Sequence, residues 1–213
     1  MNLIVELLGA PGVGKSTLLP DLVERLHALP LQATPHIDRV QQVLGFSRFV
    51  ARHPVQLARM TAAIVATRQP TAGDLAWVTR TWVKRCWRHA ELRQRSGLHL
   101  VDAGLAQALW SIGFRAGVEL GPTLVAGPLP DLVLVVDATL ATMTRRLAMR
   151  PGHQSRLERG AGDLARAREQ VVGVQRLLER VGVETVSVDN DHDGERARVA
   201  AVLAARVRAR WSR

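Results

Sequence analysis

Short hydrophobic runs alternate along the chain with longer segments in which hydrophobic residues recur every three or four positions. Runs of this length are typical of buried strands, and the recurring spacing is typical of amphipathic helices. The predicted strands are residues 3–8, 32–37, 98–102, 131–137 and 183–188, of which the second is weakened by Pro35. The predicted helices outside the central region are residues 15–29, 104–117, 139–149, 164–181 and 193–210. Strands that alternate with helices in this way predict an α/β fold with a mainly parallel sheet.

The central region, residues 39–95, has no strand-like run. Gly45, Pro54 and the stretch 69–74 interrupt it, so we predict two or three helices there. The sequence has neither an internal repeat nor a low-complexity linker. We therefore expect one domain that spans residues 1–213.

The composition argues against several classes of protein. One cysteine, Cys86, among 213 residues leaves no internal disulfide framework and no cysteine-based zinc site, and it suits a cytoplasmic protein. No apolar run approaches the ~20 residues that cross a bilayer, so we expect no membrane insertion. The hydrophobic start of the chain has no basic segment before it and is expected to be a strand rather than a signal peptide.

Positive charge is concentrated in and around the predicted central helices. The net charge is +10, and residues 48–115 carry eleven lysines and arginines against three acidic residues. One interpretation is a solvated basic surface. The other is attraction of an anionic partner, whether a substrate, a nucleic acid or an acidic lipid.

A glycine-rich sequence directly after the first strand predicts a phosphate-binding loop. Residues 9–17, GAPGVGKST, fit the pattern G-x-x-x-x-G-K-[ST] at every fixed position. In such a loop the backbone N–H groups and the start of the next helix face a phosphate, the lysine reaches the β- and γ-phosphates, and the serine hydroxyl binds Mg²⁺. The loop lacks the third glycine of a dinucleotide-binding fingerprint. The predicted ATP-binding residues of the loop are Gly9, Pro11, Gly12, Val13, Gly14, Lys15, Ser16 and Thr17.

The later strand ends distinguish between kinds of nucleotide-binding protein. A motor ATPase usually has an Asp-Glu pair at the end of a core strand, whereas here Asp102 and Asp137 are each followed by alanine. We interpret Asp137 as the N-cap of the next helix, with a metal ligand as the alternative. A GTPase needs an Asn-Lys-x-Asp motif to bind guanine, and the only lysines are Lys15 and Lys84, the latter within WVKRCW. These observations argue against both classes.

Arginines cluster in and before a polar, glycine-rich loop at residues 150–163. Phosphoryl transfer between two bound molecules needs positive charge around the transferred group and exclusion of water, and a mobile arginine lid provides both. The alternative is a solvated basic helix end. The cluster consists of Arg145, Arg146, Arg150, Arg156 and Arg159.

The phosphate loop together with this layout resembles the P-loop nucleoside and nucleotide kinases, and thymidylate-kinase-like proteins in particular. The resemblance covers nearly the whole chain, although only residues 9–16 are highly specific. It implies a three-layer α/β/α fold with a five-stranded, mainly parallel sheet. It also implies a helical acceptor-binding region at 39–95 and an arginine lid at 150–163.

The resemblance further implies roles for individual residues. Asp102 resembles the acidic residue that lies near Mg²⁺ and the acceptor. Arg146 would stack on the base of ATP and Arg150 would touch its phosphates, while Arg156 and Arg159 would belong to the lid. The loop 188–194 falls where the family lines its adenine pocket.

One position departs from the family's pattern, which has an arginine after the aspartate that Asp102 resembles. Here that position is Ala103. In the family the arginine helps to hold the phosphate of the acceptor. Either Arg39 replaces it, or the acceptor presents only a hydroxyl. In the second case Asp38 is a natural general base, and its alternative role is a helix N-cap.

Three tryptophans, Trp77, Trp82 and Trp87, lie five residues apart in the central region. On a helix, steps of five turn through about 140°, so at most two of the three can face one pocket. Core packing is one interpretation. An acceptor slot with an aromatic wall is another, and a surface for nucleic acid or membrane is the third.

We therefore expect an ATP- and Mg²⁺-dependent phosphotransferase that moves the γ-phosphate to a nucleoside, a nucleotide or a natural-product hydroxyl, as antibiotic-modifying or biosynthetic enzymes do. The alternative is a nucleotide-binding or ATPase module that acts on nucleic acid or in regulation through its basic region. The expected partner is a small-molecule acceptor, which is anionic in one of the two interpretations, rather than a membrane or a nucleic acid. A homodimer is a further option. The predicted catalytic residues are Lys15, Asp38, Asp102, Arg146, Arg150 and Arg156; the acceptor-binding residues are Asp38, Arg39, Trp82, Arg85, Asp102 and Gln107; the Mg²⁺ ligands are Ser16 and Asp102.

Overall fold

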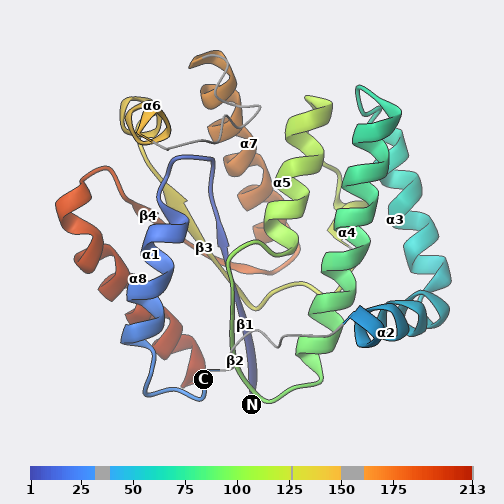
Figure 1. Cartoon of the computed structure of the whole chain (residues 1–213), viewed down its shortest axis with the longest axis horizontal. Coiled ribbons are helices and arrows are strands. Elements are labelled where there is room, and N and C mark those ends of the chain that lie inside the picture. The colour runs from blue at the N-terminus through green and yellow to red at the C-terminus, as the bar shows by residue number, and fades with distance from the viewer. Residues whose placement is uncertain (32–38, 126, 150–160, 213) are drawn as a thin grey trace.

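The computed structural model of the chain describes residues 1–31, 39–125, 127–149 and 161–212. Strands alternate with helices in these ranges, as the hydrophobic pattern predicts (Figure 1). The strands are β1 (Asn2–Leu8), β2 (Gly97–Val101), β3 (Leu132–Asp137) and β4 (Glu184–Asp189). The α-helices are α1 (Lys15–Arg25), α2 (Arg39–Arg52), α3 (Pro54–Ala66), α4 (Ala72–Arg93), α5 (Leu105–Ala116), α6 (Leu140–Ala148), α7 (Ala161–Arg180) and α8 (Arg196–Trp211). Two short 3₁₀ helices are η1 (Pro122–Val125) and η2 (Asp193–Glu195).

The described strands form one parallel sheet in the order β2-β1-β3-β4. The predicted sheet has five strands, and the described residues contain four. The predicted strand at 32–37 lies outside the described residues. Leu31 forms an isolated parallel bridge with Leu98, so the chain enters that segment beside the outer edge of β2. Because all four strands are parallel, their carboxyl ends meet at one edge of the sheet.

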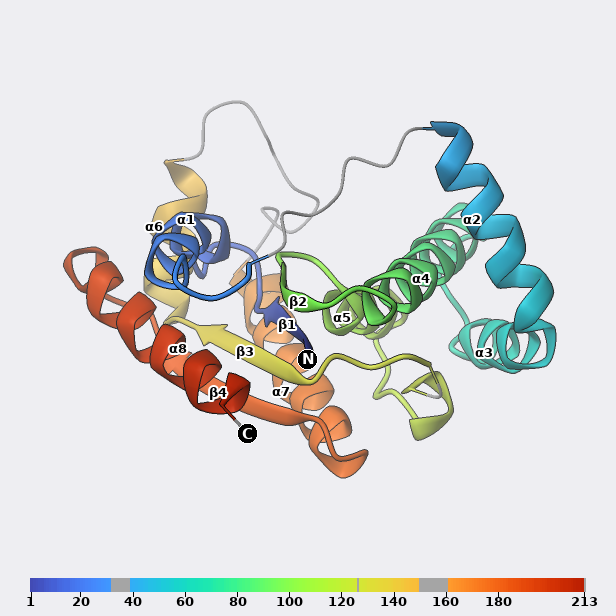
Figure 2. The same cartoon turned by 90° about the horizontal axis from the view of Figure 1, so that it is seen from below.

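Helices cover both faces of the sheet, which gives the predicted three layers. Helices α1 and α8 pack together on one face, and α5 and α7 pack together on the other (Figures 1 and 2). Helix α5 lies in the connection from β2 to β3 and α7 in the connection from β3 to β4, so both connections cross the sheet in the same direction. Right-handed crossovers in one direction place their helices on the same face, as observed. The central strands β1 and β3 are consequently buried on both faces, which explains the apolar sequence of β3 and, apart from Glu6, of β1.

The central region forms a helical arm beyond β2, built from α2, α3 and α4 (Figure 1). The longest of these, α4, is N-capped by Thr71, whose hydroxyl accepts a hydrogen bond from Asp74 N at 3.0 Å. The carboxylate of Asp74 forms an ion pair with Arg115 of α5. The arm is thereby tied to the sheet domain, and Met60, Ile64 and Trp82 extend the hydrophobic core into it.

The connection from β3 to α6 differs from the prediction in its helix cap. The prediction that Asp137 caps the helix after β3 is wrong, because Thr139 is the N-cap of α6 and accepts from Thr142 N at 3.4 Å. Asp137 is still part of β3, and its carboxylate binds the guanidinium of Arg168 on α7, with 2.6 Å between Nη2 and Oδ2. Within the described ranges, no helix combines the length and the apolar character needed to cross a membrane.

Candidate functional site

The loop between β1 and α1 has the backbone shape of a phosphate cradle. Gly12 and Gly14 adopt φ angles of 85° and 94°, a conformation that favours glycine. A side chain at Gly9 would place its Cβ 2.5 Å from the carbonyl oxygen of Val136 on β3. Helix α1 begins at Lys15, directly after the loop, so its first backbone N–H groups belong to the same concave surface.

Lys15 lies folded across this loop. Its ammonium donates hydrogen bonds to the carbonyl oxygens of Gly9 at 2.6 Å and Ala10 at 3.2 Å. The positive charge is therefore held over the cradle by neutral acceptors. Phosphate oxygens are stronger acceptors for an ammonium than backbone carbonyls are, because charge-assisted hydrogen bonds are about twice as strong as neutral ones.

Two side chains from later elements, Arg146 of α6 and Asn190 after β4, hold the loop through the carbonyl oxygen of Val13. The carbonyl oxygen of Val13 accepts from Asn190 Nδ2 at 2.7 Å and from Arg146 Nη1 at 3.1 Å. Asn190 is buried and follows β4, where its backbone N–H donates to Asp137 O at 2.9 Å. A Cβ on Gly14 would lie 2.6 Å from Asn190 Nδ2. Glycine at position 14 is thus required by this contact as well as by its φ angle.

A cavity of about 630 Å³ opens over the loop at the carboxyl edge of the sheet. Its positively charged groups come from α1, α6 and α8, and one of them, Arg196, forms an ion pair with Asp21 at 2.7 Å. Most of the residues predicted to bind ATP therefore surround one space. Asn190, from the loop 188–194 that the resemblance assigns to the adenine pocket, lines the same space, as does Arg196, which the sequence reasoning did not single out. The lining residues are Ala10, Pro11, Gly12, Gly14, Lys15, Ser16, Thr17, Arg146, Leu147, Met149, Asn190 and Arg196.

Asp102 lies at the same edge of the sheet as the loop. It directly follows β2, which pairs in parallel with β1 and matches Val101 with Glu6. Its side chain is partly exposed. The next residue, Ala103, is also partly exposed, so the position where the resembling family has arginine is accessible here but carries no charge.

Glu6, in the middle of β1, is a fully buried carboxylate that sequence reasoning missed. Its Oε1 accepts from the backbone N–H of Leu105 and its Oε2 from that of Ala106, each at 2.7 Å. The same carboxylate contacts Nε2 of His89, a buried residue of α4. Burial and, secondarily, the negative charge of Glu6 raise the pKa of the Cys86 thiol. The available signal was a charged residue within a strand whose neighbours are all apolar.

The acceptor-binding residues that we predicted on the helices lie on α4 and α5, which pack against each other. Trp82 is buried, and its Nε1 has no acceptor among the described residues. The buried Oε1 of Gln107 on α5 likewise has no donor within the described part of the chain. Arg85 is partly exposed one turn after Trp82. Trp77 is 46% exposed, with the guanidinium of Arg115 4.3 Å from its ring centre.

Other predicted residues cannot be placed. Asp38, Arg150, Arg156 and Arg159 lie outside the described residues, as does most of the predicted lid. Arg39 is the first residue of α2, and its side chain is not among those described. The arrangement of acceptor and lid groups around the cavity therefore stays a prediction.

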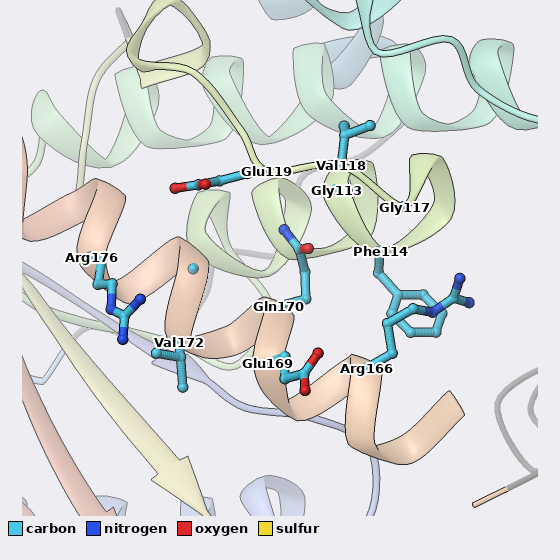
Figure 3. A pocket seen from close by; sticks show the side chains of 11 residues that line it. Gly113, Phe114, Gly117, Val118, Glu119, Arg166, Glu169, Gln170, Val172 and Arg176 are labelled. Carbon is cyan, nitrogen blue, oxygen red and sulfur yellow. The ribbon is translucent and has the colours of Figure 1, made fainter. Parts of the chain in front are cut away.

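Further cavities of the described residues lie away from the loop, and two of them are lined by helices of the arm or of the sheet face. One, of about 550 Å³, is lined by α5, the segment after it and α7, and Figure 3 shows Phe114 and Arg166 facing each other at one end of it, with 4.6 Å between the guanidinium and the ring centre. Its acidic and basic side chains are mixed. The other, of about 480 Å³, lies between α2 and α4 and is lined by Arg48, Arg52 and Arg95 beside Trp87.

The sheet order, the loop and the flanking helices define the fold of the P-loop nucleoside kinases. Two solved structures of deoxyadenosine kinase from M. mycoides share this fold. The form with bound dATP has a TM-score of 0.57 and 11% sequence identity, and the match covers 97% of this chain and 100% of that chain. The form with the products dCMP and a flexible dCDP has a TM-score of 0.55, 12% identity and the same coverage. No protein-family model and no curated protein sequence matches this chain.

Proposed function

We propose that this protein is an ATP- and Mg²⁺-dependent phosphotransferase that moves the γ-phosphate of ATP to a hydroxyl of a small acceptor, with nucleosides as the first candidates. One observation carries the proposal: the glycine loop, Lys15, Ser16 and Arg146 surround one cavity at the carboxyl edge of a parallel sheet. Ligands of open α/β sheets bind at this edge. The kinase fold of the structural neighbours supports the same reaction class.

The described residues fit the triphosphate of ATP. The glycines leave the concave side of the loop open, whereas a side chain at position 14 would collide with Asn190. Lys15 would exchange its two carbonyl acceptors for phosphate oxygens, and Arg146 would add a second positive charge. The Ser16 hydroxyl and the Asp102 carboxylate are the hard oxygen ligands that Mg²⁺ prefers, and the bound ion would neutralise charge on the phosphates.

The acceptor would lie next to Asp102, at the carboxyl edge of the sheet where the helical arm meets α5. The predicted acceptor-binding residues on α4 and α5 are Trp82, Arg85 and Gln107; the Nε1 of Trp82 and the Oε1 of Gln107 are buried and lack a hydrogen-bond partner among the described residues. In the transfer, the acceptor oxygen forms a bond to the γ-phosphorus while the bond to the β–γ bridging oxygen breaks and ADP leaves. The hydroxyl proton passes to a carboxylate, for which Asp102 and Asp38 are the candidates. Alanine at position 103 favours a hydroxyl over a phosphate acceptor.

In this proposal, arginines of α6 and of the segment after it surround the transferred phosphoryl group with positive charge. Arg146 already contacts the loop through Val13 O. Arg150 and Arg156 would close over the phosphates as lid residues and exclude water. Natural-product hydroxyls remain candidate acceptors beside nucleosides, since a site with unpartnered polar atoms and a free position at 103 does not require a base.

The test compares the two lysines of the chain. Purified wild-type protein is assayed for acceptor-dependent ADP release with a panel of deoxynucleosides, nucleosides and hydroxyl-bearing natural products. Lys15→Ala should lose at least about a hundredfold in kcat, because it removes a charge that acts on the transferred phosphoryl group. Lys84→Ala, at an exposed position of α4, is the matched control and should keep the wild-type rate. Full activity of Lys15→Ala, or ADP release that no acceptor stimulates, contradicts the proposal.

A second candidate is a nucleotide-dependent module that binds nucleic acid through its basic helices. The favouring observation is crowded positive charge on α4, where burial and the neighbouring Arg85 and Arg95 lower the pKa of Arg88. Binding to DNA or RNA that falls steeply with salt, and that is lost on neutralising Arg85 and Arg88, supports this candidate. Absence of binding at low salt removes it.

A further inference from the structure

We infer that Glu6 is a positioning residue that holds Asp102 at the phosphate edge of the sheet, by fixing the chain on both sides of it. The inference rests on the proposed function, because Asp102 matters here as a candidate Mg²⁺ ligand and proton acceptor in phosphoryl transfer. The contacts themselves are properties of the fold and can be tested without any activity.

The first contact fixes the start of α5. Leu105 and Ala106 contribute its first two helical N–H groups, and these donate to separate oxygens of Glu6, each at 2.7 Å. Early N–H groups of a helix have no partner within the helix and are usually capped by the residue before it. That residue is Gly104, which has no side chain to do so. A carboxylate from another element therefore caps α5, and its charge complements the positive end of the helix.

The second contact fixes the other side of Asp102. Strand β2 ends at Val101, which is the register partner of Glu6 on β1. Only Asp102, Ala103 and Gly104 separate this paired residue from Leu105, which is bonded to the Glu6 side chain. Asp102 thus lies in a three-residue connection that is attached to Glu6 at both ends, through sheet pairing at Val101 and through a hydrogen bond at Leu105.

The connection also approaches the carboxylate closely. A Cβ on Gly104 would lie 2.0 Å from Oε1 and 2.2 Å from Cδ of Glu6. The turn can pass this point only with glycine at 104 and the carboxylate in its present place. Small movements of Glu6 are therefore transmitted to the turn that carries Asp102.

The third contact links the same carboxylate to the helical arm. His89 of α4 touches Glu6 through Nε2, and its Nδ1 lies 3.2 Å from the backbone oxygen of Arg85 one turn earlier. Glu6 itself is three residues before Gly9, the first residue of the phosphate loop. One buried carboxylate therefore connects the strand of the donor loop, the helix of the predicted acceptor residues and the turn of Asp102.

The contacts of Glu6 are distinct from those that hold the phosphate loop. The loop is held by Asn190 and Arg146 through Val13 O, contacts that do not involve Glu6. A change at Glu6 should lower kcat through Asp102 and leave the Kd for an ATP analogue, measured without Mg²⁺, within about twofold of wild type. A misplacement of about 1 Å at a reacting group can cost about a hundredfold in rate, and we expect Glu6→Gln to lose about tenfold to a hundredfold in kcat.

The decisive experiment is a double-mutant cycle of Glu6→Gln with Asp102→Asn. If Glu6 acts through Asp102, Glu6→Gln changes kcat by less than about twofold once Asp102 is replaced, because the effects of coupled residues are not additive. His99→Gln is the matched control for loss of a buried polar side chain, since His99 is 2% exposed and its Nε2 contacts the backbone oxygen of Arg95 rather than Glu6. It should leave kcat unchanged. Fully additive losses in the cycle overturn the inference while the proposed function stands.

Amide hydrogen exchange tests the same inference without catalysis. In Glu6→Gln, exchange at Leu105 and Ala106 should be at least about tenfold faster than in wild type, while amides near Ile112 in the same helix should be unchanged. Unchanged exchange at Leu105 and Ala106 overturns the inference even if no acceptor is ever found. If Glu6→Gln does not fold, Glu6→Asp replaces it, because its shorter side chain keeps the charge and should show the same changes to a smaller extent.

Discussion

Gly104→Ala is the substitution whose consequence the structure defines most directly. The added methyl carbon would lie 2.0 Å from Oε1, 2.2 Å from Cδ and 2.7 Å from Oε2 of Glu6, distances at which something must move. The neighbour is a carboxylate held by two N–H groups and His89, so it cannot turn away without losing them. The substitution therefore tests the whole Glu6 arrangement from the opposite side.

The magnitude follows from the bonds that are lost. Each buried N–H group left without an acceptor costs about 1–3 kcal/mol, so the N–H groups of Leu105 and Ala106 together account for about 2–6 kcal/mol. Replacing glycine by alanine returns about 0.4–1 kcal/mol through the lower entropy of the unfolded chain. We expect Gly104→Ala to lower the free energy of unfolding by about 2–5 kcal/mol, measured by urea denaturation with an unchanged m-value.

Two controls isolate the cause. Gly173→Ala lies inside α7 with nothing within 4 Å of the added carbon, and should be neutral or stabilising by up to about 1 kcal/mol. In a Glu6→Ala background the carboxylate is gone, and Gly104→Ala should then cost less than about 1 kcal/mol. A Gly104→Ala protein as stable as wild type, or equal costs in both backgrounds, refutes the reasoning.

Three further predictions concern other parts of the molecule. Asn190→Ala removes one of the two side chains that hold Val13 O and should weaken ATP-analogue binding about fivefold by calorimetry; an unchanged Kd speaks against a role in shaping the loop. The native protein should not react with a thiol reagent until it is unfolded, because Cys86 is buried and its pKa is raised by that burial and by Glu6; rapid labelling of the folded protein contradicts this. Burial lowers the pKa of His99 below its ordinary 6.5, so the unfolded chain binds more protons just below that pH, and stability should fall as the pH drops through 6.5. His99→Gln should reduce this fall in unfolding free energy between about pH 8 and about pH 5.5, and an identical pH dependence would exclude His99 as its source.

The hydrophobic pattern was sufficient for the order of the elements. Buried parallel strands have uninterrupted apolar sequences and amphipathic helices a 3.6-residue period, and both signals are local. For this reason the strand at 131–137 was predicted to within one residue at either end. The strands at 98–102 and 183–188, whose short apolar runs include polar residues, were predicted equally closely. The phosphate loop was equally accessible, since its glycines, lysine and serine are consecutive and their function depends on backbone shape at that place.

The tertiary structure decided the contacts between residues far apart in sequence. Glu6 accepts hydrogen bonds from the backbone N–H groups of Leu105 and Ala106, which follow it by 99 and 100 positions in the sequence. Asn190 donates to the carbonyl oxygen of Val13, 177 positions before it. No local period encodes such pairs, because they depend on which strand lies next to which and on where each helix begins. The wrong N-cap at Asp137 has the same origin: a carboxylate at a strand end can cap the next helix or bind Arg168 of another, and only the packing of α7 decides between them.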